Sequence, residues 1–170
     1  MERRIPAGVV PVQPGPGQES VWDYPRPPRV ERVHQRIRVV VDGRSLATTD
    51  AAFRVLETAG APVYYVPPTD VELSRLRPNG RTTVCEWKGV ASYLDYDDGS
   101  RRIPNVAWTY CAPKPGYESI RDHLAFYAAR VDEAWVGDER VRPQPGGFYG
   151  GWVTDAIVGP IKGEPGSEGW

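Results

Sequence analysis

The sequence predicts an all-β protein: a compact, antiparallel two-sheet domain with one or two short helices and extended arms at both ends. Gly and Pro together make up about a fifth of the 170 residues, against a usual share of about 12%, which favours turns over long helices. The aromatic residues, 6 Trp, 9 Tyr and 3 Phe, are of types enriched in strands. Short alternating apolar segments end at Gly, Pro, Asn or Asp, as strands do in hairpin-rich proteins.

Composition along the chain predicts one domain with an arm at each end. A length of 170 residues suits a single domain that can bury a core. We expect a proline-rich N-terminal arm at residues 1–35 and an all-β core domain at residues 36–142. Residues 143–170, rich in Gly and Pro, are expected to form a tail that packs on the core.

Charge and hydropathy argue against two classes of partner. The formal net charge is −1, so no basic field is available for phosphate backbones, and nucleic acid is not expected. No stretch approaches the roughly 20 apolar residues of a membrane span, and the first residues lack the apolar region of a secretory signal. We therefore expect a soluble cytoplasmic protein without membrane contacts.

The two cysteines, Cys85 and Cys111, do not make a disulfide framework. In a reducing cytosol both are expected to be thiols. Their neighbours predict adjacent strands, so an oxidative bridge between them is left open.

The N-terminal arm is expected to be extended, because seven prolines fall within residues 6–28. Two aromatic side chains in it, Trp22 and Tyr24, are predicted to dock onto the body of the domain. They would hold the arm in place.

The clearest hairpin is predicted at residues 37–48, where two alternating segments flank Asp42 and Gly43. Residues 53–57 also favour a strand, because Gly and Pro follow too soon for a helix. A short strand bounded by prolines is expected at residues 62–67.

Two short helices are predicted. Thr69, with Glu72 three residues later, has the spacing of a capping box for a helix reaching about Leu76. Residues 118–124 could make one or two helical turns. Between these segments, residues 78–80 (Pro-Asn-Gly) predict a turn that leads into the central stretch.

The central stretch, residues 82–93, reads as two strands separated at Gly89. Cys85 and Lys88 would lie on opposite faces of an unbroken strand, so both can face one cavity only if the backbone is irregular at Lys88 and Gly89. A bulge there would re-aim the lysine. The simpler interpretation is an edge-strand lysine beside a small buried cysteine.

Beyond the central stretch, a hairpin turn is expected at residues 97–100, with a return strand at residues 103–111. Residues 126–136 are predicted to be mainly strand, followed by a turn at residues 136–139. The tail is expected to be anchored by four apolar side chains. These are Phe148, Tyr149, Trp152 and Ile157.

Several ordered motifs resemble one family of domains. They include VVVDGR at residues 39–44, PVYYVP at 62–67, TVCEWKGVASY at 83–93 and VAWTY at 106–110. Together they resemble a family of bacterial and fungal domains of unknown function labelled nucleotidyltransferase-like, over about residues 36–142. The resemblance implies a β-tent fold, two antiparallel sheets meeting at an angle, related to methionine sulfoxide reductase B and the cereblon ligand-binding domain. It implies no established activity.

Metal chemistry finds little support. Many β-tent relatives hold zinc on paired Cys-x-x-Cys motifs, and no such pair is present, so we predict no metal site and no cofactor. Asp95 and Asp97 share a strand face, as the carboxylates of a metal-dependent nucleotidyltransferase would. However, Asp97 also belongs to an ordinary hairpin turn, and no Gly-Ser phosphate-holding element precedes it.

A cysteine-dependent enzyme is a further alternative. Cys85 could pair with His123, since the members of such a dyad need only be near in space. A neighbouring Lys88 would stabilise the thiolate. The simpler interpretation places His123 in a partly exposed position at a short helix end.

The favoured hypothesis is a ligand pocket lined by Lys88, Cys85, Tyr65, Trp108 and Tyr110. Aromatic walls with a few polar groups suit a planar or sugar-like small molecule. The competing interpretation is that these rings are simply core. The alternative function is a non-catalytic scaffold that acts through protein–protein contacts of the arms, and both enzymatic activity and a homo-oligomer are left open.

Overall fold

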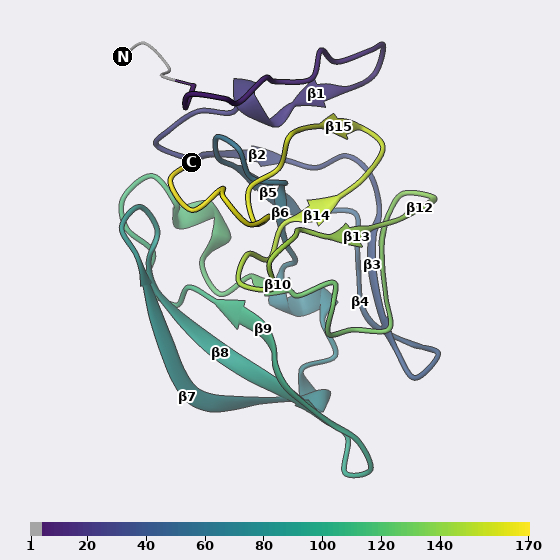
Figure 1. The fold of residues 1–170 in the computed structure, drawn as a ribbon. Helices are drawn as coiled ribbons and strands as arrows, with labels where there is room; N and C mark the ends of the chain where they lie inside the picture. The colour runs from purple at the N-terminus through teal and green to yellow at the C-terminus, as the bar shows by residue number, and fades with distance from the viewer. Residues whose placement is uncertain (1–4) are drawn as a thin grey trace.

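The computed structural model describes residues 5–170 and confirms the all-β class (Figure 1). Its helical elements within this range are single 3₁₀ turns of three residues each. They are Val21–Asp23, Pro68–Asp70, Leu73–Arg75 and Glu118–Ile120. The strands therefore carry the architecture.

Three antiparallel sheets form the body. The first has the strand order β10-β9-β8-β7 and comprises Leu124–Phe126, Arg102–Thr109, Gly89–Asp97 and Leu76–Cys85. The second has the order β12-β11-β3-β4 and comprises Glu139–Arg140, Glu133–Val136, Ile37–Val41 and Arg44–Thr49. The third has the order β2-β5-β6 and comprises Arg29–Arg32, Phe53–Leu56 and Val63–Tyr65.

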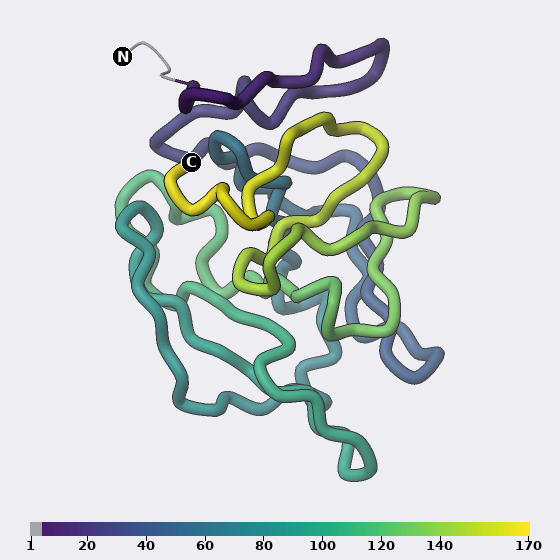
Figure 2. Tube along the Cα trace, viewed as in Figure 1, coloured from purple at the N-terminus to yellow at the C-terminus, as the bar shows by residue number. Residues whose placement is uncertain are grey.

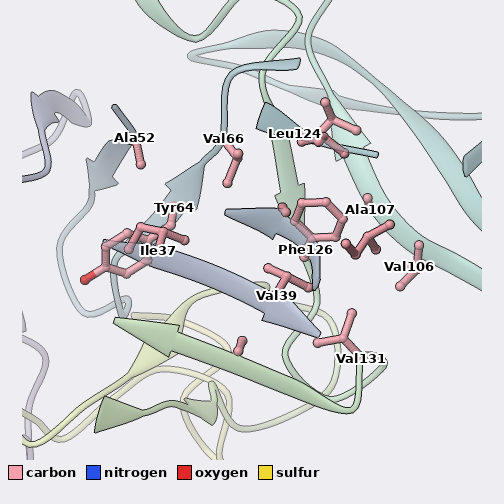
Figure 3. Packing of buried hydrophobic residues seen from close by; sticks show 14 of the residues in the cluster. Ile37, Val39, Ala52, Tyr64, Val66, Val106, Ala107, Leu124, Phe126 and Val131 are labelled. Carbon is pink, nitrogen blue, oxygen red and sulfur yellow. The ribbon is translucent and has the colours of Figure 1, made fainter. Parts of the chain in front are cut away.

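The first and third sheets are joined at one point. Val66 and Leu124 exchange two backbone hydrogen bonds of 2.8 Å, which carries the pairing from β6 to β10. The main hydrophobic core packs side chains of these sheets against β3 and β11 (Figure 3). Ile37 and Val39 on β3 and Phe126 on β10 belong to this core, each no more than 1% exposed. The predicted antiparallel architecture is thus present, although three sheets rather than two form the body.

Several predicted turns are confirmed. β3 and β4 form the hairpin at Asp42 and Gly43, with Asp42 at φ 54°. β8 and β9 are joined at residues 98–101, and β11 and β12 at Gly137 and Asp138. Residues 53–56 are strand β5, as their alternation predicted.

The predicted capping box at Thr69 is wrong. Thr69 lies inside the 3₁₀ turn Pro68–Asp70, and no side chain caps either turn of this segment. Tertiary bonds divide the segment instead, because Val71 bridges Ala47 and the Glu72 amide donates to the Leu46 carbonyl at 2.8 Å. The result is two short turns rather than one helix. The predicted helix at residues 118–124 is likewise a single turn, Glu118–Ile120.

Two further local predictions need correction. Residues 78–80 lie within β7, where the pairing with β8 shifts register between Pro78 and Thr82, so the predicted turn is a strand irregularity. Residues 126–136 are not one strand. β10 ends at Phe126 and β11 begins at Glu133, with turns between them.

Both ends of the described chain pack on the body. Trp22 and Tyr24 are buried, as predicted, in a small cluster that also holds Leu56 and Ile157. Short strands β1, Glu19–Ser20, and β15, Ile157–Val158, pair in parallel, so the two terminal regions lie side by side at one end of the molecule (Figure 2).

The tail reaches into the main core. Between the short strands β13, Arg142–Pro143, and β14, Trp152–Val153, the chain doubles back, and Trp152 is only 1% exposed. Phe148 is 68% exposed, so the prediction that it anchors the tail is wrong. No helix among residues 5–170 has the length and apolar character needed to cross a membrane.

Candidate functional site

A second hydrophobic cluster includes Tyr65, Trp108 and Tyr110, and a cavity of about 290 Å³ lies beside it, between the β7–β8–β9 sheet and the tail. Its wall includes all five residues that the sequence singled out. They are Lys88, Cys85, Tyr65, Trp108 and Tyr110. Strands β6, β7 and β9, the residue after β9 and one turn therefore bring these side chains together, and their role in binding stays a prediction.

Strand pairing explains how the rings meet. The bridge from Val66 to Leu124 and the pairing of Leu124 with Thr109 set β6 close to β9. Tyr65 on β6 and Trp108 on β9 consequently touch. The Trp108 indole Nε1 donates to the Tyr65 hydroxyl at 3.4 Å, and the two rings meet edge-on with centroids 6.5 Å apart.

Tyr110 follows β9 and packs beside Tyr65, with ring centroids 6.3 Å apart. Neighbouring residues of β9 belong to different hydrophobic clusters. Ala107 packs in the main core, whereas Trp108 packs in the cluster beside the cavity. Both faces of β9 are thus buried.

Lys88 reaches the cavity because it sits in a tight turn rather than on a strand. Cys85 at the end of β7 pairs with Gly89 at the start of β8, so residues 86–88 close a hairpin. Gly89 has φ 108°, a conformation that L side chains rarely adopt. The Lys114 amide also donates to the Lys88 carbonyl at 2.9 Å. The irregularity required at this position exists, although as a hairpin turn and not as a bulge.

The Lys88 ammonium has aromatic and sulfur neighbours. Nζ lies 5.8 Å from the centroid of the Tyr110 ring, within the range of a cation–π contact. Cys85, three residues earlier in the same hairpin, also interacts with it electrostatically. Burial alone would lower the pKa of Lys88, but Tyr65, Cys85 and the more distant Glu57 outweigh burial and raise this pKa above its usual value. The side chain is therefore cationic at neutral pH.

Three tyrosines of the wall, Tyr65, Tyr110 and Tyr127, stay neutral. Burial raises the pKa of Tyr65 and of Tyr110, and for Tyr110 the neighbouring Tyr65 and Cys85 add to the effect. Burial also raises the pKa of Tyr127 to about 12. At physiological pH these hydroxyls can donate and accept hydrogen bonds but carry no charge.

The tail supplies a second wall that our sequence reasoning missed. Gly150, in the tail, packs directly against the Trp108 indole. The Tyr127 ring, which precedes the tail in sequence, is tilted against the same indole with ring centroids 4.7 Å apart. A Cβ on Gly150 would lie 2.0 Å from Trp108 Cη2, so only glycine allows this approach. The run Gly-Gly-Phe-Tyr-Gly-Gly at residues 146–151 could have indicated such a contact.

Gln144 fixes the course of the tail beside the cavity. Its buried carboxamide accepts from the Ala61 amide at 3.1 Å and donates to the Lys162 carbonyl at 2.9 Å. Gly151 fits tightly against the same groups, because its Cβ position lies 2.5 Å from the Ala61 oxygen. Hydrogen bonds and close packing therefore fix the position of this part of the wall.

Charged side chains on the cavity wall are mainly cationic. Arg26 and Glu57 form an ion pair of 3.2 Å, and both are more than a third exposed. Lys162 Nζ donates to the Trp170 backbone oxygen at 2.9 Å and lies 5.2 Å from the Tyr149 ring. Together with Lys88, the wall therefore has three cationic side chains and one anionic side chain among the residues that the structure describes.

The alternative of a Cys85–His123 dyad gains no support. His123 is not part of the cavity wall; its Nδ1 lies 2.9 Å from the Arg121 carbonyl and its ring packs on Phe53. Within residues 5–170 no hydrogen bond joins the two side chains. Cys85 and Cys111 are both free thiols, and burial together with Asp122 raises the pKa of Cys111.

The two carboxylates considered for nucleotidyl transfer, Asp95 and Asp97, form hydrogen bonds that hold the local structure. Asp95 is 4% exposed and bonded to Asn79, Arg102 and Asn105, while Asp97 accepts from the Gly99 amide within the hairpin turn. In the part of the chain that the structure describes, no three His, Cys, Asp or Glu side chains gather as metal ligands would. Neither observation provides the two-cation site that this chemistry needs.

A family model described as a domain of unknown function, DUF427, matches residues 29–137. The matched segment begins at β2 and ends after β11. It contains the turn that holds Lys88 and the strands β6, β7 and β9, which line one side of the cavity. The chain belongs to this family. The resemblance seen in the sequence motifs is confirmed, whereas the tail that completes the cavity lies outside the matched DUF427 residues. No curated protein matches the chain.

Proposed function

We propose that this DUF427 protein binds a small organic molecule in the cavity beside Lys88. The observation that carries the proposal is an aromatic-lined space of about 290 Å³ with a few polar groups on its wall. Ligand sites typically have this make-up, with volumes from about 300 Å³ upward. The volume suits a molecule of one or two rings.

The size of the space distinguishes a ligand pocket from aromatic rings that only form part of the core. Rings in a well-packed core leave few voids larger than a water molecule, whose share of liquid volume is about 30 Å³. Here Trp108, Tyr110 and Tyr127 surround a space many times that size. The space is open to solvent, so an organic occupant would displace water from these aromatic surfaces and gain dispersion contacts with them.

The scaffold alternative has weaker support. Both arms on which it depended contribute buried side chains to the body, Trp22 from one and Trp152 from the other. Surface already committed to folding is not available to a partner. The arms do expose large apolar side chains, Ile5, Val10, Val12 and Phe148, but exposed apolar residues are common on protein surfaces.

A matched pair of variants tests the proposal. Thr83→Trp would place an indole into the cavity, whereas Thr82→Trp would place the same ring on the exposed neighbouring position of β7. We would screen neutral, anionic and cationic small molecules by thermal shift. A ligand at about 100 times its dissociation constant adds about 2.7 kcal/mol to the free energy of unfolding.

We expect hits that stabilise the wild type and Thr82→Trp but not Thr83→Trp. Circular dichroism of both variants would verify that they are folded, and the smaller pair Thr83→Leu and Thr82→Leu repeats the test if the indole is not tolerated. The proposal fails if the hits stabilise both members of the pair equally. It also fails if no compound of any charge class binds.

A further inference from the structure

We infer that the ligand is a small planar organic monoanion of the aryl carboxylate type, whose carboxylate lies against the Lys88 ammonium and whose ring lies on the Trp108 side of the cavity. This inference rests on the proposed function and adds the chemical class of the ligand. Three observations carry it. Lys88 has no carboxylate partner among residues 5–170, the charged side chains of the wall are mainly cationic, and the Tyr65 hydroxyl is a second donor beside Lys88.

The three lysines of the chain differ in their partners. Lys114 donates to the Glu86 carbonyl at 2.9 Å, and Lys162 donates to the Trp170 oxygen at 2.9 Å. Lys88 is half-buried on the cavity wall, and among residues 5–170 no carboxylate lies within ion-pair distance of it. A partly desolvated ammonium without a counterion is unfavourable, and an anionic ligand would remove that cost.

The nearest acidic group on the wall does not fill this role. Glu57 is on the same cavity but forms its ion pair with Arg26 at 3.2 Å. The described wall thus has an excess of cations, although the whole chain has a formal net charge of −1. Charges of one sign in an enclosed site raise the local concentration of ligands of the opposite sign.

Tyr65 offers a second donor beside Lys88. Its hydroxyl accepts from Trp108 Nε1 and is 1% exposed, and within residues 5–170 no acceptor for its own proton is found. Lys88 and Tyr65 are close enough for their charges to influence each other's pKa. A carboxylate has two oxygens and can accept from an ammonium and a phenol together.

The number of free donors favours a monoanion over a phosphate ester. Arg26 and Lys162, the remaining cations of the wall, already have partners, so one ammonium is available. A phosphate dianion would leave part of its charge unpaired in a site with aromatic walls. The rings of Trp108 and Tyr127, with centroids 4.7 Å apart, provide apolar surface for a planar body.

Isosteric probes can test this assignment on the full chain. We would titrate indole-3-carboxylate, its neutral carboxamide, and phenyl phosphate into wild type, Lys88→Met and Lys114→Met, using calorimetry. We expect the wild type and Lys114→Met to bind the carboxylate at least 10-fold more tightly than the carboxamide. Lys88→Met should bind the carboxylate at least 10-fold more weakly than wild type and lose the preference. Phenyl phosphate should bind more weakly than the carboxylate.

Two controls keep the outcome clear. Lys88→Gln, which keeps a hydrogen-bond donor without the charge, replaces Lys88→Met if that variant does not fold. Because the pKa of Lys88 is raised, carboxylate affinity should also be constant from about pH 6 to pH 9.

The inference is wrong if the carboxamide binds wild type as tightly as the carboxylate, or if Lys114→Met weakens binding as much as Lys88→Met. It is also wrong if phenyl phosphate binds more tightly, or if benzoate, indole-3-carboxylate and naphthalene-2-carboxylate all fail to bind. The proposed function would survive any of these results if neutral or cationic compounds bind the wild type and are excluded by Thr83→Trp. If no neutral, anionic or cationic compound binds in that screen, both the inference and the proposed function are wrong.

Discussion

Asp95 shows how one buried carboxylate can organise irregular strands. It accepts from Asn79 Nδ2 at 2.7 Å, Arg102 Nη2 at 2.8 Å and the Asn105 amide at 2.8 Å. Asn79 lies in the irregular part of β7, and Asn105 has φ 49° on β9. One side chain thus joins three neighbouring strands where their regular pairing is interrupted.

The bonds to Asp95 make its stability contribution depend on pH. Burial opposes its ionisation, but the hydrogen bonds from Asn105, Arg102 and Asn79 prevail and hold the pKa of Asp95 below 3.8, its ordinary value. A carboxyl with a lowered pKa stabilises the folded state above the pKa of the unfolded chain. This stabilisation is lost as the pH falls through the pKa of the folded state.

We therefore predict that Asp95→Asn lowers the free energy of unfolding by about 1–3 kcal/mol at pH 7, since buried donors lose their charged acceptor. The difference from wild type should shrink towards pH 3 and below. Urea unfolding at pH 7 and pH 3 measures both values. Asp138→Asn, on an exposed turn, serves as the control and should change little. An equal loss for Asp95→Asn at the two pH values would contradict the assignment.

At the scale of elements, the 3₁₀ turn Leu73–Arg75 connects the second sheet to the first. Arg75 is 5% exposed, and its guanidinium donates to the Tyr96 hydroxyl on β8 at 2.7 Å and to the Val41 carbonyl on β3 at 3.0 Å. It also donates to the Ser45 carbonyl at 3.3 Å and to the Glu72 carboxylate. The turn thereby holds the β3–β4 hairpin against β8.

We predict that Arg75→Lys lowers the free energy of unfolding by about 2 kcal/mol, because a single ammonium cannot reproduce the planar fork of donors and leaves buried acceptors unpaired. Arg77→Lys, two residues later and exposed, should cost much less. Chemical denaturation of both variants tests the difference. Equal effects would show that the bonds between sheets contribute little.

At the scale of the whole molecule, the N-terminal arm is part of the folded body. Val21, Trp22 and Tyr24 are all at most 6% exposed, and the Tyr117 hydroxyl donates to the Pro28 carbonyl at 2.8 Å. Residues 5–17 are mostly exposed. The arm therefore has an outer part on the surface and an inner part that completes a hydrophobic cluster.

Two truncations distinguish these parts. Removing residues 1–17 should change the free energy of unfolding by less than about 1 kcal/mol, because residues 5–17 are mostly exposed. Removing residues 1–28 should cost about 3 kcal/mol or more, because it deletes a buried tryptophan and uncovers Leu56. Thermal and urea unfolding of the two shortened chains give the comparison. Equal stability of both would mean that the arm and the body are independent.

Much of the strand pattern could be predicted from the sequence because it depends on neighbours along the chain. Alternation placed β3, β5 and β8, and Asp42-Gly43 and Gly137 marked hairpins through their local backbone preferences. The same local reasoning brought Tyr65, Trp108 and Lys88 towards one place, since a break at Gly89 was visible in the residue types.

Tertiary contacts decided the rest. The helix expected from Thr69 is divided because Val71 pairs with Ala47, a bond worth more than a local cap. One side of the cavity wall comes from the tail, where Gln144 bonds Ala61, 83 positions away, and Gly150 packs on Trp108, about 40 positions away. Periodicity describes which face of an element is apolar, but it does not specify which distant segment covers that face. The strands were therefore readable from the sequence, whereas closure of the cavity depended on the packing of the whole chain.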